Sequence, residues 1–252
     1  MFSNAILKRV PSSFSNGITT ADLGKPDVSG ARRQHEAYAL ALKNCGLELT
    51  VLEANEDFPD SCFVEDVAVI TPEIAIITRP GSSSRRDETR SIIPVLEKYR
   101  QVDFITAPGT LEGGDVMQAE RHFYIGITER TNKAGAHQLG KILSQFGYNH
   151  SMIPVTGALH LKSVVNYIGN NVLLISGDLK NHEAFARFKI IEVAKGDEYA
   201  SNCLFVNGKL IMPAGFERVK RDLLKMDYEI TEVEMSEFRK MDGGLSCLSL
   251  RF

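Results

Sequence analysis

A short unit of strand, helix and strand recurs along this chain, and the repetition limits the possible folds more than any other pattern. Each copy begins with an apolar strand, continues into a helix and returns in a second strand near Pro or Glu. Four copies are Glu73–Thr78, Arg86–Tyr99 and Val102–Thr106; His122–Ile127, Thr131–Phe146 and His150–Pro154; Asn171–Ile175, His182–Phe188 and Lys189–Val193; Lys209–Pro213, Glu217–Met226 and Glu229–Val233. Such self-similarity indicates a repeat architecture.

A fifth copy is complete only when the two ends of the chain meet. Its strands and helix are Ala5–Lys8, Arg32–Cys45 and Leu47–Leu52, joined by a C-terminal strand around Cys247. Hairpin-like segments separate the copies, at Cys62–Ile70, Asp115–Ala119, Lys162–Ile168 and Ser201–Val206. A chain that needs both ends for one unit is expected to close on itself.

One such unit has too little apolar surface to be stable, whereas five in a ring bury a common centre. We therefore predict an α/β fold: a five-bladed α/β propeller of strand, hairpin, helix and strand units around a central site. Residues 1–252 are expected to form this single domain. A doubly wound sheet is the usual alternative for alternating strands and helices. It requires no hairpin in every repeat, and no glycine-rich phosphate loop follows any strand.

The composition excludes several classes of partner. The chain has 252 residues and a formal net charge of −3, which argues against a broad surface for nucleic acid or membrane. Its four cysteines lie far apart, without the Cys and His spacing of a zinc site. The N-terminal apolar stretch is too short for a signal sequence, and no segment reaches the length of a membrane span. Free thiols in a reducing cytoplasm are expected.

Polar residues gather in the loops that precede strands of successive units, and equivalent loops of a ring meet near its axis. These residues are Asp60, Glu65 and Asp66; Glu112, before a double glycine; His160, in an apolar stretch; and Cys247, after Gly243-Gly244-Leu245-Ser246. Each has an ordinary explanation alone, as a buried thiol, a core histidine, a turn or a capping carboxylate. Their occurrence together, at the starts of strands, favours a catalytic centre.

This set of groups suggests attack by a thiolate on a carbon that bears positive charge. Histidine can protonate a leaving amine and then deprotonate water, and a carboxylate bonded to it fixes its tautomer. Further carboxylates would hinder thiolate formation by repulsion unless the substrate is a cation. A guanidinium group fits paired carboxylates. Arg85 and Arg130 could then hold a substrate carboxylate, so an arginine-like amino acid is indicated.

The motifs that carry these residues resemble those of the dimethylarginine dimethylaminohydrolase family. That family belongs to the guanidino-group-modifying superfamily of five-bladed α/β propellers, the pentein fold. The resemblance covers nearly the whole length, through Phe14–Gly17, Phe63–Asp66, Thr78–Gly81, Ser84–Arg86, Leu111–Asp115, Arg130–Asn132, Leu159–Lys162 and Leu245–Cys247. It implies hydrolysis of asymmetric dimethyl- and monomethyl-L-arginine to citrulline and an amine, through a covalent S-alkylthiouronium on the cysteine. Thiol-based hydrolysis of this kind requires no cofactor and no metal.

The resemblance also implies roles for individual residues. Cys247 resembles the nucleophile, His160 the acid and base, and Glu112 the carboxylate that pairs with histidine and guanidinium. The other residues of the implied substrate site are Asp66 beside the guanidinium, Asp60 at the α-amino group, Arg85 and Arg130 at the α-carboxylate, Ile18 and Met241 through main-chain carbonyls, Ser163 after the histidine motif, and Glu65. Arg86 is the alternative to Arg85. The polar segment Ser12–Gly30 is either a lid over the substrate or a plain surface connection.

Other functions remain open at this stage. Arginine deiminases and amidinotransferases share the catalytic set but are longer chains. A non-enzymatic pentein similar to the ribosome anti-association factor has no use for Glu112, His160 and Cys247 together. A papain-like hydrolase places its thiol at a helix near the N-terminus, unlike Cys247, and does not explain the carboxylates. An exposed blade edge could also pair two rings, and a homodimer is expected.

Overall fold

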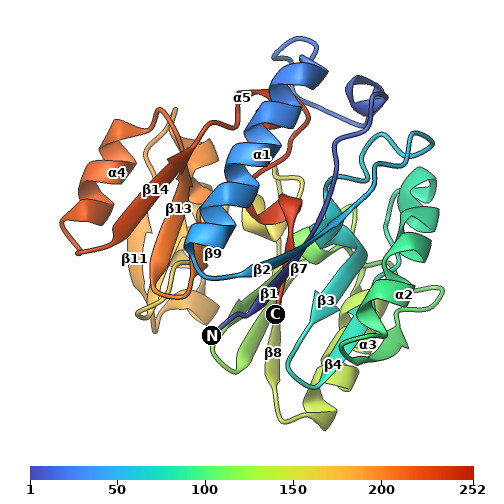
Figure 1. Cartoon of the computed structure of the whole chain (residues 1–252). Coiled ribbons are helices and arrows are strands. Elements are labelled where there is room, and N and C mark those ends of the chain that lie inside the picture. Colours follow the sequence, from blue (N-terminus) through green and yellow to red (C-terminus); the bar gives the residue numbers. More distant parts are fainter.

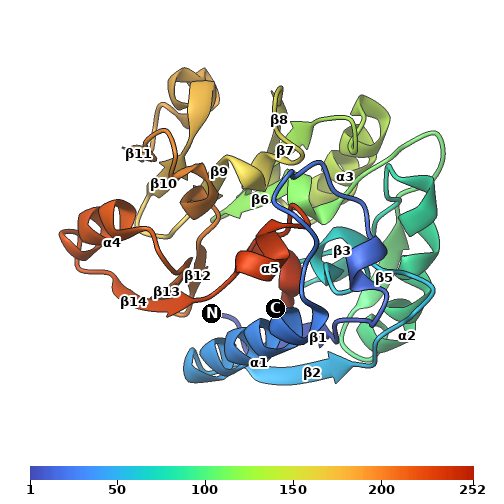
Figure 2. The same cartoon turned by 90° about the horizontal axis from the view of Figure 1, so that it is seen from above.

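The fifteen strands of the chain form five three-stranded sheets around a common centre, which confirms the predicted ring (Figures 1 and 2). The computed structural model describes residues 1–252. In every sheet the middle strand pairs antiparallel with one neighbour and parallel with the other. The antiparallel pair is the hairpin that the sequence predicts, and the parallel strand returns after the connecting segment.

The order of strands is the same in each sheet. The five sheets are β15 (Leu250–Arg251), β1 (Asn4–Lys8) and β2 (Glu48–Leu52); β3 (Ala68–Ile70), β4 (Ile74–Ile77) and β5 (Gln101–Phe104); β6 (Val116–Ala119), β7 (His122–Ile127) and β8 (Asn149–Pro154); β9 (Val165–Tyr167), β10 (Val172–Ile175) and β11 (Lys189–Glu192); β12 (Leu204–Val206), β13 (Lys209–Pro213) and β14 (Glu229–Val233). The helices are α1 (Val28–Asn44), α2 (Ile93–Leu96), α3 (Lys133–Gln145), α4 (Glu217–Leu224) and α5 (Ser236–Arg239).

The two ends of the chain close the ring, as predicted. Strand β15 pairs antiparallel with β1, and backbone hydrogen bonds join Asn4 and Phe252 in both directions. Figure 1 shows the N- and C-termini close together at this sheet. The strand begins three residues later than expected, because Cys247 itself lies in a 3₁₀ turn, Ser246–Leu248.

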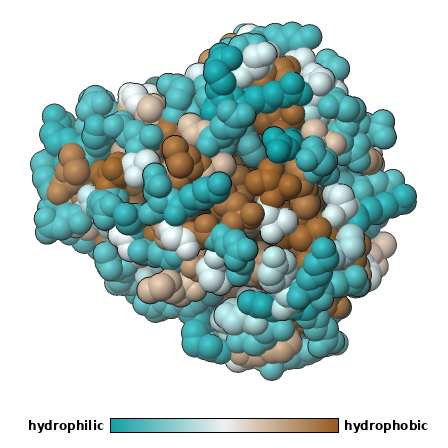
Figure 3. Space-filling view, in the orientation of Figure 1, coloured by the Kyte–Doolittle hydropathy of each residue, from teal (hydrophilic) through white to brown (hydrophobic).

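Five hydrophobic clusters hold the ring together, one between each pair of adjacent sheets. Side chains of a strand alternate in direction, so a middle strand reaches both neighbours. In β10, for example, Val172 and Leu174 enter one cluster while Leu173 and Ile175 enter the next. Burial of each such side chain contributes about 1.5–3 kcal/mol. This is why the middle strands are mostly apolar. Hydrophilic residues surround the more apolar middle of the face in Figure 3.

Three of the five predicted helices differ from expectation. The segment Arg86–Tyr99 is a 3₁₀ helix over Ser83–Ser91 followed by the short α2, because Pro94 lacks the N–H that a continuous helix needs. The segment His182–Phe188 contains only a 3₁₀ turn, Glu183–Phe185, in which Phe185 alone is buried. Helix α1 begins earlier, at Val28, where Asp27 caps it. None of the helices is both long and apolar enough to cross a membrane.

Candidate active site

Four equivalent loops bring the predicted acid, base and nucleophile to the centre of the ring. Each loop precedes the first strand of its sheet and contains a 3₁₀ turn: Val64–Val67 with Asp66, Gly113–Asp115 after Glu112, Leu161–Ser163 after His160, and Ser246–Leu248 with Cys247. One cavity with an empty volume of about 370 Å³ lies among them. Nine of the eleven predicted site residues line it: Ile18, Asp60, Asp66, Arg85, Glu112, Arg130, His160, Met241 and Cys247.

His160 and Glu112 form the closest acid–base pair of the cavity. The Nε2 atom of His160 lies 2.7 Å from Oε2 of Glu112, and both residues are buried. The other oxygen of Glu112 accepts a hydrogen bond of 3.0 Å from the Gly81 N–H, and the Glu112 N–H donates to Oγ1 of Thr131. These bonds fix the carboxylate and hold the imidazole ring in one orientation.

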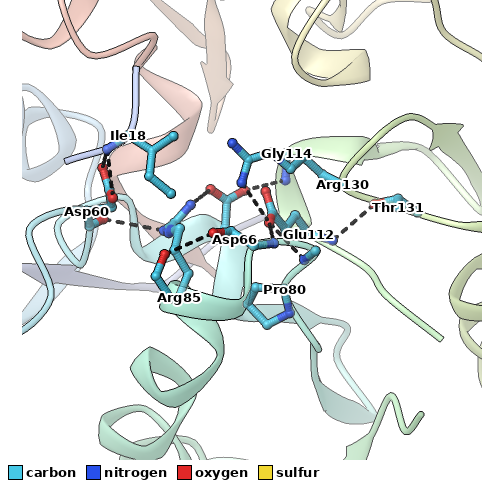
Figure 4. Close-up of polar contacts among 12 residues, drawn as sticks. Ile18, Asp60, Asp66, Pro80, Arg85, Glu112, Gly114, Arg130 and Thr131 are labelled. Atoms are coloured by element: carbon cyan, nitrogen blue, oxygen red, sulfur yellow. Dashed lines mark hydrogen bonds and ion pairs between the residues drawn. The ribbon is translucent and has the colours of Figure 1, made fainter. Parts of the chain in front are cut away.

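Asp66 lies beside this pair and is held by Arg85 (Figure 4). Its Oδ2 atom is 2.7 Å from Nη1 of Arg85, and its Oδ1 atom accepts from the Gly114 N–H at 2.9 Å. Arg85 also pairs with the buried Glu88 at 2.9 Å. The neighbouring Arg86 does not line the cavity; its Nε donates to the carbonyl of Pro80. Arg85 is therefore the arginine of this pair that faces the site.

The charges of the site depend on one another. Burial would lower the pKa of His160, but Asp66 and the hydrogen bond to Glu112 outweigh it and raise the pKa to about 9. Burial would raise the pKa of Asp66, but His160 and Arg85 lower it to about 2. The resting cavity thus contains an imidazolium between carboxylates.

The thiol of Cys247 is kept neutral. Burial raises its pKa to about 12, and the carboxylates of Glu65 and Asp66 act in the same direction. The loop that carries it approaches its neighbours closely: a Cβ on Gly244 would lie 2.5 Å from the Asn202 side chain. The double glycine is therefore needed for close approach of the backbone. Asn202, from the fifth equivalent loop, accepts from the Ser246 N–H at 3.0 Å and so fixes the residue before the thiol.

The N-terminal segment Ser12–Gly30 covers one side of the cavity. The Ile18 N–H donates to both oxygens of Asp60, at 3.2 and 3.1 Å. The N–H and hydroxyl of Thr20 donate to Asp242, which itself lines the cavity. Burial raises the pKa of Asp60, although Arg85 and the Ile18 N–H oppose the shift. The segment is thus tied by its backbone to the acidic wall of the site.

Comparison with known proteins agrees with this arrangement. A family model described as N,N dimethylarginine dimethylhydrolase, eukaryotic, matches residues 25–248. An N(G),N(G)-dimethylarginine dimethylaminohydrolase of Pseudomonas aeruginosa is 44% identical over 254 residues and covers 100% of both chains. One from Streptomyces coelicolor is 33% identical over 250 residues and covers 98% of this chain and 96% of the relative. The chain belongs to the dimethylarginine dimethylaminohydrolase family. The predicted family and hydrolase class are confirmed.

Solved structures extend the similarity to three dimensions. A cysteine-to-serine mutant of the Pseudomonas aeruginosa dimethylarginine dimethylaminohydrolase, complexed with citrulline, superposes with a TM-score of 0.99 at 43% identity, with 100% of both chains covered. The N-terminal domain of an arginine dihydrolase from cyanobacteria superposes with a TM-score of 0.89 at 18% identity, with 98% of this chain and 97% of that chain covered. The second match shows the shared pentein fold.

Two predicted site residues of this family member lie outside the cavity lining. Ser163 lies at the wall of a second cavity, described below. Glu65 is buried, and its Oε1 atom accepts from Nζ of Lys162 at 2.6 Å and from Nη2 of Arg251 at 2.9 Å. Its carboxylate is therefore paired within the chain. The presence of Glu65 beside Asp66 in sequence gave no sign that its partners would be Lys162 and Arg251.

Arg251 is one of several positioning residues that the motifs did not reveal. Its Nη1 atom donates to the carbonyls of Ser246 and Ser249, at 3.2 and 2.7 Å, on both sides of Cys247. Asp115 has a similar role at the histidine loop, since its Oδ1 atom accepts from the Leu161 N–H at 2.9 Å. The only signs of these contacts in the sequence are a charged residue, Arg251, in the apolar C-terminal strand and an acid, Asp115, directly after Gly113-Gly114.

Three groups of the site could also bind a metal ion. Ligand atoms of Asp66, Glu112 and His160 all lie within 4.8 Å of one another. Each already has a partner: His160 and Glu112 bond to each other, and Asp66 bonds to Arg85 and Gly114. These three residues therefore form an acid–base cluster in which the His160 imidazolium supplies the positive charge that a metal ion would otherwise bring.

Proposed function

We propose that the chain hydrolyses asymmetric dimethyl- and monomethyl-L-arginine to L-citrulline and dimethylamine or methylamine. The observation that supports this most directly is one cavity that contains a cysteine thiol, an imidazolium and buried carboxylates. The same cavity has apolar side chains, Phe63 and Leu159, beside its acidic ones, as a cation with an alkyl chain requires. Its acidic side chains favour a planar cation such as a guanidinium group.

The substrate is proposed to bind with its guanidinium between Asp66 and Glu112. Arg130 is the main ligand for the α-carboxylate. Its Nη1 atom lies 3.7 Å from Oε1 of Glu112, too far for a hydrogen bond, whereas Nε and both Nη atoms of Arg85 already donate within the chain. Asp60 receives the α-amino group, and the carbonyls of Ile18 and Met241 lie on the same side of the cavity.

The reaction starts from a neutral thiol and a protonated His160. Binding of the cation offsets the carboxylates that hold the proton on Cys247, so the thiolate forms and its proton passes to solvent. The sulfur adds to the guanidinium carbon, and His160 protonates the departing amine. The carbon remains bound to sulfur as an S-alkylthiouronium.

The second half returns the enzyme to its first state. Neutral His160 removes a proton from water, whose oxygen adds to the thiouronium carbon. The carbon–sulfur bond then breaks as the remaining hydroxyl proton passes to the sulfur, which leaves citrulline, the Cys247 thiol and protonated His160. Glu112 stabilises the imidazolium in both halves through its 2.7 Å bond to Nε2.

A panel of arginine, monomethylarginine and asymmetric dimethylarginine, with citrulline as the readout, tests this function. Citrulline should form from the two methylated substrates. The Cys247→Ser variant should bind dimethylarginine, measured by calorimetry, and release no citrulline. Citrulline from arginine alone would indicate a deiminase-like activity instead, and no citrulline from any of the three would reject the proposal.

Three further points belong to this proposal. Residues 1–252 act as one catalytic domain. The enzyme works in a reducing compartment, the cytoplasm, because its cysteines are free and the nucleophile must remain a thiol. Two rings pair as a homodimer through an exposed sheet edge, for which light scattering of the purified chain is the measurement.

A further inference from the structure

A second cavity lies next to the first, and the two share the catalytic residues. Its wall includes His160 and Cys247, together with Gly114, Ser163, Asn202 and Gly244. The space in it that the centres of water molecules can occupy is about 50 Å³. One water needs roughly 10–15 Å³ by this measure. The second cavity can therefore hold a few waters.

The chemistry of the two walls differs. The first cavity combines Asp60, Asp66 and Glu112 with apolar side chains such as Phe63 and Leu159, as a cationic substrate with an alkyl chain requires. The second has hydroxyl, amide and backbone groups around a single lysine and Asp242, and only two hydrophobic residues. Polar groups of this kind hold water.

The wall is rigid on one side and has a free hydroxyl on the other. Asn202 donates to the carbonyl of Lys162 at 2.9 Å and to Oγ of Ser246 at 3.1 Å. The hydroxyl of the half-buried Ser163 has no hydrogen-bond partner within the chain, whereas its N–H donates to the His160 carbonyl and its own carbonyl accepts from Ser201. Its hydroxyl is thus available to a molecule in the cavity.

The imidazole of His160 connects the cavities through its two nitrogen atoms. Nε2 is bonded to Glu112, in the wall of the first cavity. Nδ1 lies on the side of Gly114, since a Cβ on Gly114 would be 2.7 Å from it, and Gly114 lines the second cavity. Because Nε2 is occupied, Nδ1 is the atom that can exchange a proton with a reacting molecule.

We propose that the second cavity supplies the water that resolves the covalent intermediate, an inference that rests on the proposed function. While the S-alkylthiouronium is present, the substrate's chain fills the first cavity and blocks entry from that side. Water then reaches the sulfur-bound carbon past Ser163. Nδ1 of His160 takes one proton from this water as its oxygen bonds to the carbon. The carbon–sulfur bond breaks afterwards, as the second proton of the water passes to the sulfur.

The test fills the cavity and separates the two half-reactions. Ser163→Leu adds a larger side chain at the wall, and Ser163→Ala is the matched control that leaves the space open. Rapid-quench measurements follow amine release from dimethylarginine, citrulline release and the mass of the protein. In Ser163→Leu the first equivalent of amine should appear at the wild-type rate, which also shows that the variant is folded.

Citrulline release from Ser163→Leu should then slow by on the order of tenfold or more, with the adduct mass accumulating. Ser163→Ala, which removes the hydroxyl but leaves the space open, should accumulate much less adduct than Ser163→Leu. Unchanged citrulline release in Ser163→Leu, or equal slowing of amine and citrulline, would overturn the water route while the wild type still turns over. If the wild type itself releases neither amine nor citrulline, the proposed function and the water route both fail.

Discussion

The buried imidazolium of His160 should stabilise the folded chain as well as serve in catalysis. Asp66 and Glu112 outweigh the effect of burial and raise its pKa from 6.5 to about 9. At about 1.4 kcal/mol per pKa unit, this shift corresponds to about 3 kcal/mol of preference for the protonated native state. That is a large part of the total stability of an ordinary domain.

The direction of the pH dependence follows from the sign of the shift. A group whose pKa is raised on folding binds its proton more tightly in the native state. Its contribution is complete below pH 6.5 and is lost as the pH rises through about 9. Other groups titrate in the same range, so the effect must be isolated by comparison with His160→Gln, which removes the titrating ring.

Urea unfolding of the wild type and of His160→Gln, at about pH 6 and about pH 10, measures the effect. The difference in unfolding free energy between the two proteins should shrink by about 3 kcal/mol at the higher pH. His137→Gln, on the exposed surface of α3, is the control and should follow the wild type at both values. Parallel behaviour of the wild type and His160→Gln would refute the reasoning, because no proton would then be held preferentially in the native state.

Three other outcomes are expected. Alkylation of Cys247 by iodoacetamide in the absence of substrate should keep rising beyond pH 9, since burial raises the thiol pKa to about 12; a plateau near pH 7 would contradict this. Arg251→Met frees the Ser246 carbonyl and should lower kcat by about tenfold at unchanged KM, measured by citrulline formation; a change in KM alone would speak against a positioning role. Gly17→Ala places a Cβ against the Asp60 carboxylate and should raise KM. An unchanged KM would show that the segment Ser12–Gly30 can move away from Asp60 without affecting substrate binding.

The ring could be predicted from the sequence because the apolar pattern of each repeat lies within a short stretch of the chain. The alternating side chains of β10 enter two different clusters, so the strand is apolar at every position. The same holds along β4, and β7 and β13 are mostly apolar after their first residues, His122 and Lys209. Each such strand is followed by its parallel partner, which makes the repeat visible. The candidate catalytic residues could be grouped for a related reason: they lie in equivalent loops, at or next to a 3₁₀ turn, before the first strand of four of the sheets.

The rest depends on contacts between distant parts of the chain. The pairing of Glu65 with Arg251 joins residues that are 186 positions apart, and it exists only because β15 closes the ring beside β1. The predicted helix over His182–Phe188 is wrong for a different reason. Phe185 and Phe188 are both buried in the same cluster, but a helix of only seven residues is not stable by itself, and the segment forms a single 3₁₀ turn.

The electrostatics of the cavity make the reactivity of the thiol depend on the substrate. Burial, Glu65 and Asp66 all disfavour the thiolate of Cys247, whereas a cation placed between Asp66 and Glu112 would favour it. His160 is already protonated at neutral pH, so it is ready to donate a proton and cannot take one from the thiol. A neutral product such as citrulline supplies no charge to reverse these preferences. Under the proposed function, the carboxylates that would bind the guanidinium therefore also keep the Cys247 thiol protonated until the substrate arrives.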